Sequence, residues 1–401
     1  MFWEVFFEVE VALSIFEKDN LSMNFKSVFF LLILIFATSC KSEKEKIEEK
    51  AVSREAIIDS TINQFQKILL KNQIDSVFAK YDFNGSVAVL KGKNILYQKN
   101  QGFENFKTNA KIDSNSVFAI ASISKQFTAV LILLQEEEGK LSTDDLVSKY
   151  IKEFEPAEFK IITIKQLLNH TSGISDFGNG LLSKPGEKFN YSNKGFRILG
   201  EIIEKVSGKS YDQNALDLFQ KVGMKNSSTA NLFKGNHFSG AFIGNSKNYQ
   251  EIENMPKRLA NKEISVPAGG ILTTVSDLHL WNSKLYGGEI LKPESLKKMT
   301  EKSADRDHPV FGKMEYGFGI MMNKNLPLSY FHSGYVKGCP SLNIYYPATK
   351  TSVIILSNIA DEGKGKNTIF NPHKEIKGLS DALQNTVIEL QKELLRSKSS
   401  K

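Results

Sequence analysis

Cysteine is scarce in this sequence, and no residue spacing typical of a metal site occurs. Among 401 residues there are two cysteines, Cys40 and Cys339, so we expect no disulfide framework. The six histidines are scattered, without a close pair or a His-Glu-x-x-His segment. Because protein ligands of zinc recur at short, characteristic spacings, we expect no bound metal ion, and we expect no other cofactor.

Long runs of one charge are also absent. The formal net charge is +7, and lysines and glutamates are interspersed without a long basic stretch, which argues against a nucleic-acid-binding surface. No Gly-x-Ser-x-Gly segment occurs, so the nucleophile motif of α/β-hydrolase esterases is missing. The hydrophobic content of 41% and the charged content of 24% are ordinary values for a globular protein.

One apolar run near the start of the chain, Val28–Phe36, is too short to span a bilayer. It follows the positive segment Met23–Lys26 and precedes Ala37–Ser39 and Cys40, an order that resembles a bacterial lipoprotein signal peptide. We expect residues 23–40 to be that signal, with Cys40 lipidated and the protein anchored in the bacterial envelope, facing the periplasm or the surface. The alternative is a buried helix with an incidental cysteine.

The segments around this signal differ from it in composition. Residues 1–22 do not fit in front of a signal peptide, so our hypothesis is that they are an upstream extension and that translation starts at Met23. Residues 41–56 are charged and poor in apolar side chains, which indicates a tether. We expect the folded domain over residues 57–401.

Hydrophobic periodicity in this domain predicts an α/β fold. An antiparallel sheet flanked by helices is expected from residues 57–120 together with about 265–401, and a mostly helical part from about 121–264. Residues 231–264 show no clear hydrophobic periodicity, so we assign no element there. The predicted elements are helices over 57–81, 194–206, 211–221 and 379–395, helices beginning at Ser122, 143–145, Thr163 and Thr274, a hairpin turn at 91–94, and strands over 316–322, 328–334, 341–346 and 352–358.

A serine and a lysine stand three residues apart at the start of an apolar stretch. On a helix this spacing places Ser122 and Lys125 on one face, and the apolar residues that follow predict that the helix is buried. A desolvated lysine has a lowered pKa and can take the proton of a serine hydroxyl, which suits nucleophilic catalysis. The pattern alone is weak, because Ser295 and Lys298 show the same spacing in a polar stretch.

A second candidate segment follows the turn Pro185-Gly186. Tyr191 and Asn193 are two residues apart, so in an extended segment both side chains point the same way. A phenol near a lysine can act as a general base, and an amide can hold a substrate carbonyl. The alternative is a turn with a partly buried tyrosine. His170, beside a predicted helix end, is either a catalytic base or, as we favour, a histidine that holds backbone carbonyls.

Three motifs in order resemble those of the penicillin-recognising serine hydrolases, specifically the class C β-lactamase-like group. They are Ser122-x-x-Lys125, Tyr191-x-Asn193 and His332-Ser333-Gly334 on a predicted strand. That group includes D-alanyl-D-alanine carboxypeptidases, D-aminopeptidases and esterases. The resemblance covers roughly residues 60–360, and further matches are Gly139-Lys-Leu, His170-Thr-Ser-Gly173, Pro185-Gly186, Ala268-Gly-Gly270 and Tyr316-Gly-Phe-Gly319.

The resemblance implies a β-lactamase/transpeptidase-like fold and an acyl-enzyme mechanism without a cofactor. Ser122 would attack a carbonyl, Lys125 and Tyr191 would share the proton transfers, and Asn193 would orient the substrate. The backbone N–H groups of Ser122 and Tyr335 would form the oxyanion hole. The strand residues implied to contact the substrate are His332, Ser333, Gly334 and Tyr335.

One residue departs from the pattern of many β-lactamases and penicillin-binding proteins, which carry lysine where His332 stands. Histidine is mostly neutral near pH 7, so the implied activity shifts from an efficient β-lactamase toward an esterase or a D-peptidase. The substrate would be a small molecule or a peptide. The alternative function is a penicillin-binding or ligand-sensing protein with little or no turnover. Cys339 is expected to be a packing residue.

Overall fold

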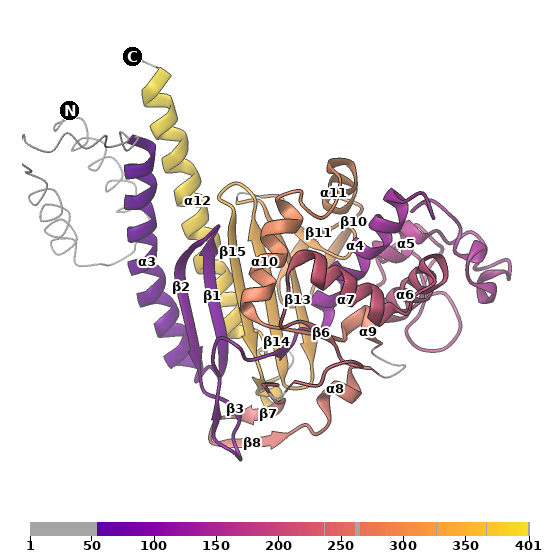
Figure 1. Cartoon of the computed structure of the whole chain (residues 1–401), viewed down its shortest axis with the longest axis horizontal. Coiled ribbons are helices and arrows are strands. Elements are labelled where there is room, and N and C mark those ends of the chain that lie inside the picture. The colour runs from indigo at the N-terminus through magenta and orange to yellow at the C-terminus, as the bar shows by residue number, and fades with distance from the viewer. Residues whose placement is uncertain (1–53, 236, 261–264, 326, 366, 400–401) are drawn as a thin grey trace, which may run out of the picture. The chain divides into compact units, whose positions relative to one another are not determined.

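The computed structural model describes residues 54–399 apart from 236, 261–264, 326 and 366 (Figure 1). The expected extension over 1–22, the signal peptide with Cys40, and most of the tether lie outside these residues and stay predictions. Two compact units are distinguished among the described residues, one formed by 54–65 with 386–399 and the other by 66–385. The larger unit contains every predicted catalytic and substrate-binding residue.

An eight-stranded antiparallel sheet is the centre of the larger unit, with the strand order β10-β11-β12-β13-β14-β15-β1-β2. β1 (Gly85–Lys91) pairs with β15 (Thr351–Ser357), with Val87 opposite Ile355, so early and late segments share one sheet. This confirms the predicted fold class and the antiparallel pairing of the last strands. The other strands are β2 (Asn94–Gln101), β10 (Ala304–His308), β11 (Gly312–Tyr316), β12 (Met321–Asn323), β13 (Ser329–Val336) and β14 (Cys339–Tyr346).

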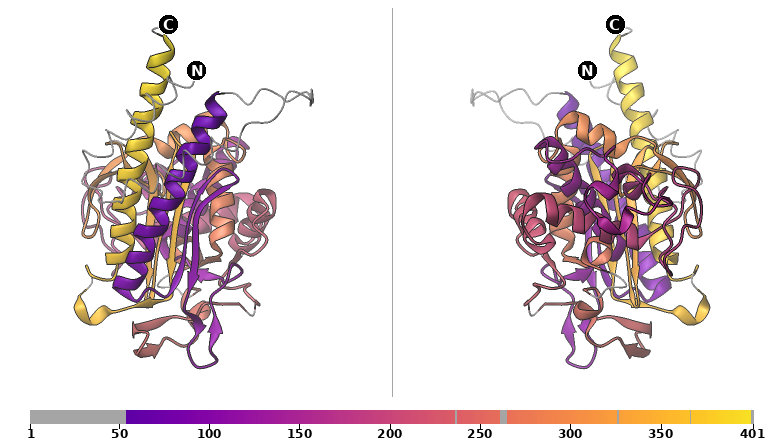
Figure 2. Two further views of the ribbon diagram at one scale, coloured as in Figure 1. Left: turned by 90° about the vertical axis from the view of Figure 1, so that its left-hand side faces the viewer. Right: turned by 90° about the vertical axis from the view of Figure 1, so that its right-hand side faces the viewer.

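One face of the sheet is covered by parts of two long helices, α3 (Arg54–Tyr81) and α12 (Asn371–Ser399), as Figures 1 and 2 show. Tyr97 of β2 donates a hydrogen bond to Asp75 of α3 at 3.0 Å, which fixes this helix on the sheet. Both helices begin before the predicted bounds. The difference is small for α3 and larger for α12, whose first turns carry polar residues that hide the apolar pattern.

The opposite face is covered by α10 (Val275–Tyr286), and α4 (Ser124–Glu137) lies in the core beside it. The Trp281 ring of α10 is fully buried and stacks on Phe127 of α4, with 3.9 Å between the ring centroids. Most side chains of α4 are buried, including those of Ser124, Lys125, Gln126, Thr128 and Gln135, which confirms the predicted buried helix. α4 is therefore a rigid base for the residues at its N-terminus.

The rest of the unit consists of short helices with capped ends and small strand pairs. Thr163 forms a capping box with Gln166 at the predicted start of a helix, and Gly208 ends the helix before it in the left-handed conformation. The helices are α5 (Ile164–Leu168), α6 (Asn193–Ser207), α7 (Tyr211–Val222), α8 (Met255–Arg258), α9 (Val266–Gly269), α11 (Pro293–Thr300) and the 3-10 turns η1 (Ala121–Ile123), η2 (Val147–Lys149), η3 (Lys152–Phe154) and η4 (Glu362–Lys364). The short strands are β3 (Phe103–Asn105), β4 (Ala110–Lys111), β5 (Phe118–Ala119), β6 (Ser228–Thr229), β7 (Phe242–Asn245), β8 (Asn248–Glu251), β9 (Ile271–Thr273) and β16 (Ile359–Ala360).

Two predicted elements are wrong. No α-helix opens at 143–145, where the chain forms loops and the 3-10 turn η2 instead. The strand predicted over 316–322 is interrupted, because Gly319 adopts a left-handed conformation (φ 67°) between β11 and β12. A Cβ at Gly319 would lie 2.6 Å from the Lys125 carbonyl oxygen, so this turn packs directly against α4.

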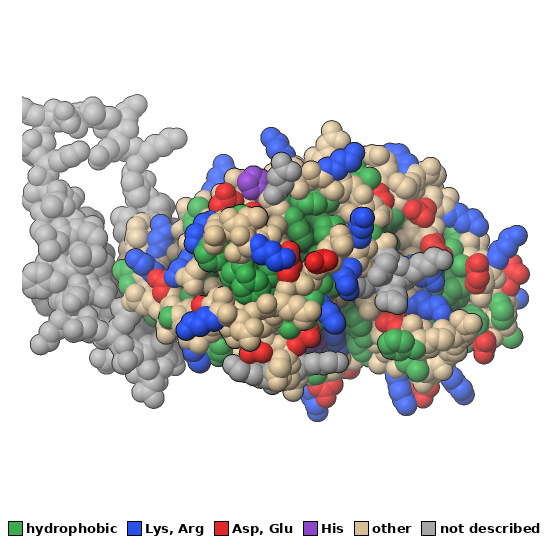
Figure 3. Space-filling model, turned by 90° about the horizontal axis from the view of Figure 1, so that it is seen from below, with side chains coloured by type: hydrophobic (Ala, Val, Ile, Leu, Met, Phe, Trp, Pro, Cys, Tyr) green, Lys and Arg blue, Asp and Glu red, His purple; other side chains and the backbone are tan. Residues whose placement is uncertain are grey.

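The surface carries both signs of charge. On the face seen in Figure 3, acidic and basic side chains are interspersed and no broad area has one sign. None of the described helices combines the length and the apolar character needed to cross a bilayer.

Candidate active site

Ser122 lies on the 3-10 turn η1, directly before α4, and not on the α-helix itself. Its neighbours Ala121 and Ile123 are buried, whereas Ser122 is partly exposed. Ala121 has a φ of 45°, a conformation that costs a non-glycine residue about 1–3 kcal/mol. Such strain persists only where surrounding contacts enforce it. One such contact comes from Ile271 of β9, whose backbone N–H donates a hydrogen bond to the Ser124 hydroxyl at 3.0 Å.

Lys125 is fully buried, and its amine faces Ser122. The Nζ atom lies 3.2 Å from Ser122 Oγ, 2.8 Å from Asn193 Oδ1 and 2.7 Å from the Ala268 carbonyl oxygen. The last two atoms can only accept hydrogen bonds. A neutral amine would give its two hydrogens to them and direct its lone pair at the Ser122 hydroxyl.

The charge state of Lys125 follows from this environment. Burial lowers the pKa of the amine, and the neighbouring Tyr191 phenol and Asp176 carboxylate act in the opposite direction. Arg306 lowers the pKa further through charge repulsion. The net direction is toward the neutral form, which is the form that can accept a proton.

Tyr191 is partly exposed beside this amine. Lys125 Nζ lies 4.8 Å from the centre of the Tyr191 ring, and the Arg306 guanidinium carbon lies 4.7 Å from the same centre. The His170 ring packs at 4.4 Å between centroids. The structure therefore brings the predicted phenol and the predicted amine into one cluster, together with the Arg306 guanidinium, which no sequence motif indicated.

Asn193 is the first residue of α6, so the prediction that Tyr191 and Asn193 share an extended segment is wrong at its end. Ser192 is the N-cap and accepts a hydrogen bond from the Gly195 N–H at 3.0 Å. The helix start turns the Asn193 amide oxygen toward Lys125, while the amide nitrogen donates to Asp176 at 3.2 Å.

His170 is held in a buried position with a φ of 61°. Its Nδ1 accepts a hydrogen bond from the Ser192 backbone N–H at 3.1 Å, so Nε2 carries the proton of the neutral ring. Burial places the pKa of His170 well below its usual range. The ring thus positions the Tyr191 segment by accepting from a backbone N–H group, whereas the reading that we favoured was a contact with backbone carbonyls.

The third motif lies on β13. His332 is buried; its Nδ1 donates to the Ser333 carbonyl at 2.6 Å, and its Nε2 accepts from the Tyr316 hydroxyl at 3.1 Å. Burial, followed by the charges of Arg306 and Lys125, places the pKa of His332 well below its usual range. The histidine is therefore neutral, and it orders the hydrogen bonds inside the motif.

Gly334 marks the closest approach of β13 to the turn that carries Ser122. A Cβ at Gly334 would lie 2.1 Å from the Ile120 carbonyl oxygen, and Ser341 Oγ donates to the same oxygen at 2.9 Å. Tyr335 follows directly and donates its hydroxyl to Glu362. The oxyanion hole formed by the N–H groups of Ser122 and Tyr335 stays a prediction. Ser333 Oγ lies 3.4 Å from Nε2 of the buried His308.

Sequence reasoning missed two charged residues of this cluster, Asp176 and Arg306. Asp176 lies just beyond the His170-Thr-Ser-Gly173 match, so its place in the sequence gave a signal that was not used. Arg306 lies on the edge strand β10, far from any motif, and only the tertiary structure places it over Tyr191.

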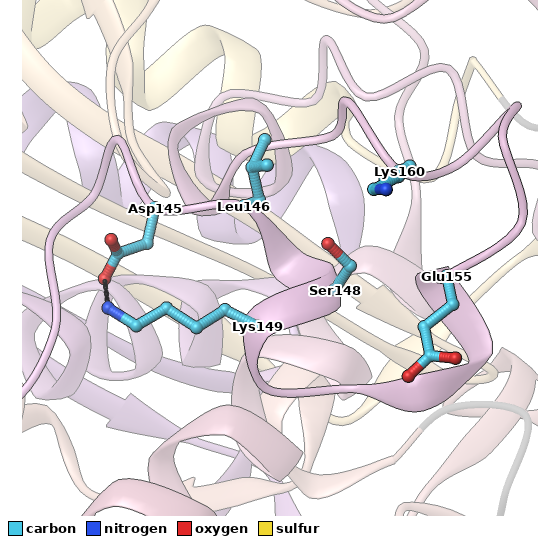
Figure 4. A pocket seen from close by; sticks show the side chains of 6 residues that line it. All are labelled: Asp145, Leu146, Ser148, Lys149, Glu155 and Lys160. Atoms are coloured by element: carbon cyan, nitrogen blue, oxygen red, sulfur yellow. Dashed lines mark hydrogen bonds and ion pairs between the residues drawn. The ribbon is translucent and has the colours of Figure 1, made fainter.

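Two cavities differ in their relation to these residues. A groove of about 1130 Å³ begins at Asp176 and Asn193, runs along α6 and reaches Tyr211 at the start of α7. A pocket of about 630 Å³ beside η2 contains none of the predicted site residues; Figure 4 shows its lining and the ion pair between Lys149 and Asp145 (3.0 Å). Within the described part of the chain, no group of three or more His, Cys, Asp or Glu side chains is arranged to hold a metal ion.

This chain is similar in sequence to known proteins and similar in fold to solved structures. The chain is 26% identical over 346 residues to penicillin-binding protein 4* of Bacillus subtilis, covering 77% of this chain and 75% of the relative. Among solved structures it is similar to the octameric penicillin-binding protein homologue of Pyrococcus abyssi (TM-score 0.64, 26% identity, 72% and 73% coverage). A D-amino acid amidase of Ochrobactrum anthropi shares the fold (TM-score 0.65, 18% identity, 78% and 98% coverage).

The family assignment agrees with the ordered motifs. The model of the family described as Beta-lactamase matches residues 61–370, which span the sheet, α4 and all three motifs. This chain belongs to the Beta-lactamase family.

Proposed function

We propose that this protein is a serine hydrolase that acts through an acyl-enzyme. The observation that carries the proposal is the position of Lys125 Nζ, 3.2 Å from Ser122 Oγ and held on its other side by two acceptors. Neither acceptor can donate, so a neutral Lys125 that gives its hydrogens to them has its lone pair free for the serine hydroxyl. This is the arrangement that a nucleophile and its base require.

The proposed reaction has two halves. Lys125 takes the Ser122 proton as Oγ attacks the substrate carbonyl, and the oxyanion is bound by the N–H groups of Ser122 and Tyr335. The bond to the leaving group then breaks, and Lys125 returns the proton to that group with the help of Tyr191, leaving an ester on Ser122. Water attacks this ester by the same route, which releases the acid and restores the serine hydroxyl.

An ester, an amide or a D-amino-acid peptide is the proposed substrate, in preference to a β-lactam. His332 supports this choice, because it is buried, neutral and engaged with Tyr316 and the Ser333 carbonyl. A residue in that state offers no charge to the carboxylate of a β-lactam. Asn193 would hold the substrate carbonyl next to the cleaved bond.

A second candidate function is penicillin binding or ligand sensing with little turnover. The similarity to a relative named penicillin-binding protein 4* favours it. The two candidates differ only in the second half of the reaction, so the rate at which the ester on Ser122 is hydrolysed distinguishes them.

We also propose that the protein is anchored in the bacterial envelope through a lipid on Cys40, with its catalytic domain over residues 57–401 facing the periplasm or the surface. The signal-like order of residues 23–40 supports this, and penicillin-binding protein 4*, to which the chain is similar, comes from the bacterium Bacillus subtilis. Membrane fractionation of the full chain tests the anchor. The wild type should sediment with membranes and Cys40→Ala should not; equal sedimentation of both would refute lipid anchoring at this residue.

The decisive experiment follows a fluorophosphonate and a fluorescent penicillin on the purified domain, together with p-nitrophenyl esters, D-amino-acid amides, D-alanyl peptides and nitrocefin. We expect Ser122 to be labelled and one ester or amide class to be turned over. Labelling without release of the acyl group would favour the second candidate.

Matched serine variants provide the control. Ser122→Ala should abolish labelling and turnover, whereas Ser295→Ala, which removes the serine of the other Ser-x-x-Lys pattern, should leave both unchanged. Ser295 lies on α11, outside the cluster around Lys125. Full activity in Ser122→Ala would refute the proposed function.

A further inference from the structure

A single exposed carboxylate organises the segment that carries Tyr191 and Asn193. Asp176 accepts four hydrogen bonds there: from Ser192 Oγ (2.8 Å), from the backbone N–H groups of Asn193 (3.0 Å) and Lys194 (2.9 Å), and from Asn193 Nδ2 (3.2 Å). The two backbone N–H bonds are typical of a carboxylate at a helix N-terminus, and the hydroxyl belongs to the N-cap Ser192. The bond from the side-chain amide of Asn193 is the informative one.

The amide of Asn193 lies between a hydrogen-bond acceptor, Asp176, and a hydrogen-bond donor, Lys125. Its nitrogen faces the Asp176 carboxylate, which only accepts, and its oxygen faces Lys125 Nζ at 2.8 Å. A carboxylate cannot receive the amide oxygen, so Asp176 allows only one of the two amide orientations. Without that constraint the amide could turn over, because its two ends have nearly the same shape.

The orientation decides what Lys125 can do. With the oxygen toward Nζ, a neutral amine donates to Asn193 and to the Ala268 carbonyl, and its lone pair remains for Ser122. With the nitrogen toward Nζ, the lone pair of a neutral amine would accept from Asn193. The amine would then donate to Ser122 Oγ and could not take its proton.

We infer that Asp176 is a positioning residue, which holds the Asn193 amide in the orientation that leaves Lys125 free to act as the base. The inference rests on the proposed function and deepens it, since it adds a residue three hydrogen bonds away from the attacking oxygen. Asp176 itself acts through Asn193.

The test compares variants that separate positioning from helix capping. Asp176→Asn keeps the size of the side chain and an oxygen that can still accept from Ser192 Oγ and the Lys194 N–H at the helix N-terminus. Its amide nitrogen replaces the oxygen that accepts from the Asn193 backbone N–H and from Asn193 Nδ2, and it can donate to the oxygen of a turned-over Asn193 amide. We expect the maximal rate of Ser122 acylation by a p-nitrophenyl ester to fall about 10–100-fold, while the half-saturating concentration changes less than about threefold.

A matched control reports on structure alone. Asp145 also accepts several hydrogen bonds in a local turn, from the Ser142 N–H (2.8 Å), Lys149 (3.0 Å) and Tyr150 (2.5 Å), and it is not part of the site. Asp145→Asn should leave the acylation rate unchanged. If Asp176→Asn also leaves it unchanged while the wild type is acylated, the inference is wrong and the proposed function stands.

A double-mutant cycle tests whether Asp176 acts through Asn193. Asn193→Ala removes the group through which Asp176 acts, so adding Asp176→Asn to it should change the acylation rate less than about twofold. A full additional 10–100-fold loss would overturn the inference, because Asp176 would then act by another path.

Failure of the proposed function would be visible separately, as a wild type that no probe acylates. The positioning of Asn193 can still be measured then, from neutron crystal structures of the wild type and Asp176→Asn, which locate the amide hydrogens. We expect the hydrogen bond from Lys125 to the Asn193 oxygen in the wild type and its loss in the variant. The same bond in both structures would refute the inference.

Discussion

At the scale of single residues, the site depends on one buried amine, Lys125, which two acceptors hold beside the Ser122 hydroxyl. Burial lowers the pKa of Lys125, and a lysine with a lowered pKa is a base that loses its proton nearer to neutral pH. Arg306 adds a fixed positive charge on the neighbouring Tyr191 ring. These effects concern proton transfer in the first half of the reaction.

Lys125→Arg tests this base. Arginine keeps a positive charge but does not lose its proton in proteins, so it cannot accept one from Ser122. We expect acylation of Ser122 to slow by about 10²–10⁴-fold. In the wild type the acylation rate should rise with pH as Lys125 is deprotonated, with an inflection below the usual lysine value of 10.5.

Stopped-flow acylation across a pH series gives both quantities. Lys125→Arg should lose the rising limb, and Ser295→Ala should keep it. An unchanged pH profile in Lys125→Arg would show that another group removes the proton.

At the scale of elements, the position of β13 against η1 determines where the nucleophile lies. Gly334 allows this contact, because any side chain there would meet the Ile120 carbonyl, which precedes the strained Ala121. The strand and the turn come from distant parts of the sequence, so their contact is a property of the completed sheet.

Gly334→Ala should therefore move the turn that carries Ser122. We expect a loss of about 1–3 kcal/mol in the free energy of unfolding, because backbone atoms must shift to admit the methyl group, and a large loss of acylation. Denaturant unfolding and probe labelling measure the two effects. Gly378→Ala on α12 is the control, since a Cβ there meets nothing and alanine favours a helix; it should be neutral or slightly stabilising.

How much the sequence predicts also differs between elements. The buried helix α4, the capped helices α5 and α6 and the last three strands follow from local periodicity and capping residues, which are short-range signals. The break between β11 and β12 was missed because it depends on Gly319 packing against α4. Asp176 lies beside a motif match, a sequence signal that was not used, whereas Arg306 was missed because its contact with Tyr191 is encoded by no sequence spacing.

At the scale of the whole molecule, several buried histidines make folding sensitive to acid. His373 is fully buried, donates from Nε2 to the Pro340 carbonyl at 3.2 Å, and has its pKa lowered to about 3 by burial. In the unfolded chain its pKa returns to about 6.5, so below that pH the unfolded state binds a proton that the folded state does not. His170 and His332 act in the same direction.

We expect the free energy of unfolding to fall as the pH drops from 6.5 toward 3, by up to about 1.4 kcal/mol per pH unit for each such histidine. His373→Gln should make this decline shallower, even where it lowers stability at pH 7. Urea unfolding at a series of pH values measures the slope. An equal slope in the variant would contradict the assignment for His373.

The pairing of β1 with β15 has a consequence for biosynthesis. A chain emerging from the ribosome makes the first hairpin early, but one of its edges has no neighbour until the last strands are translated. An unpaired strand edge of this kind can pair with other chains during that interval. The same delay applies to the turn that carries Ser122, because it packs against β13 and reaches its final place only once that strand has been made.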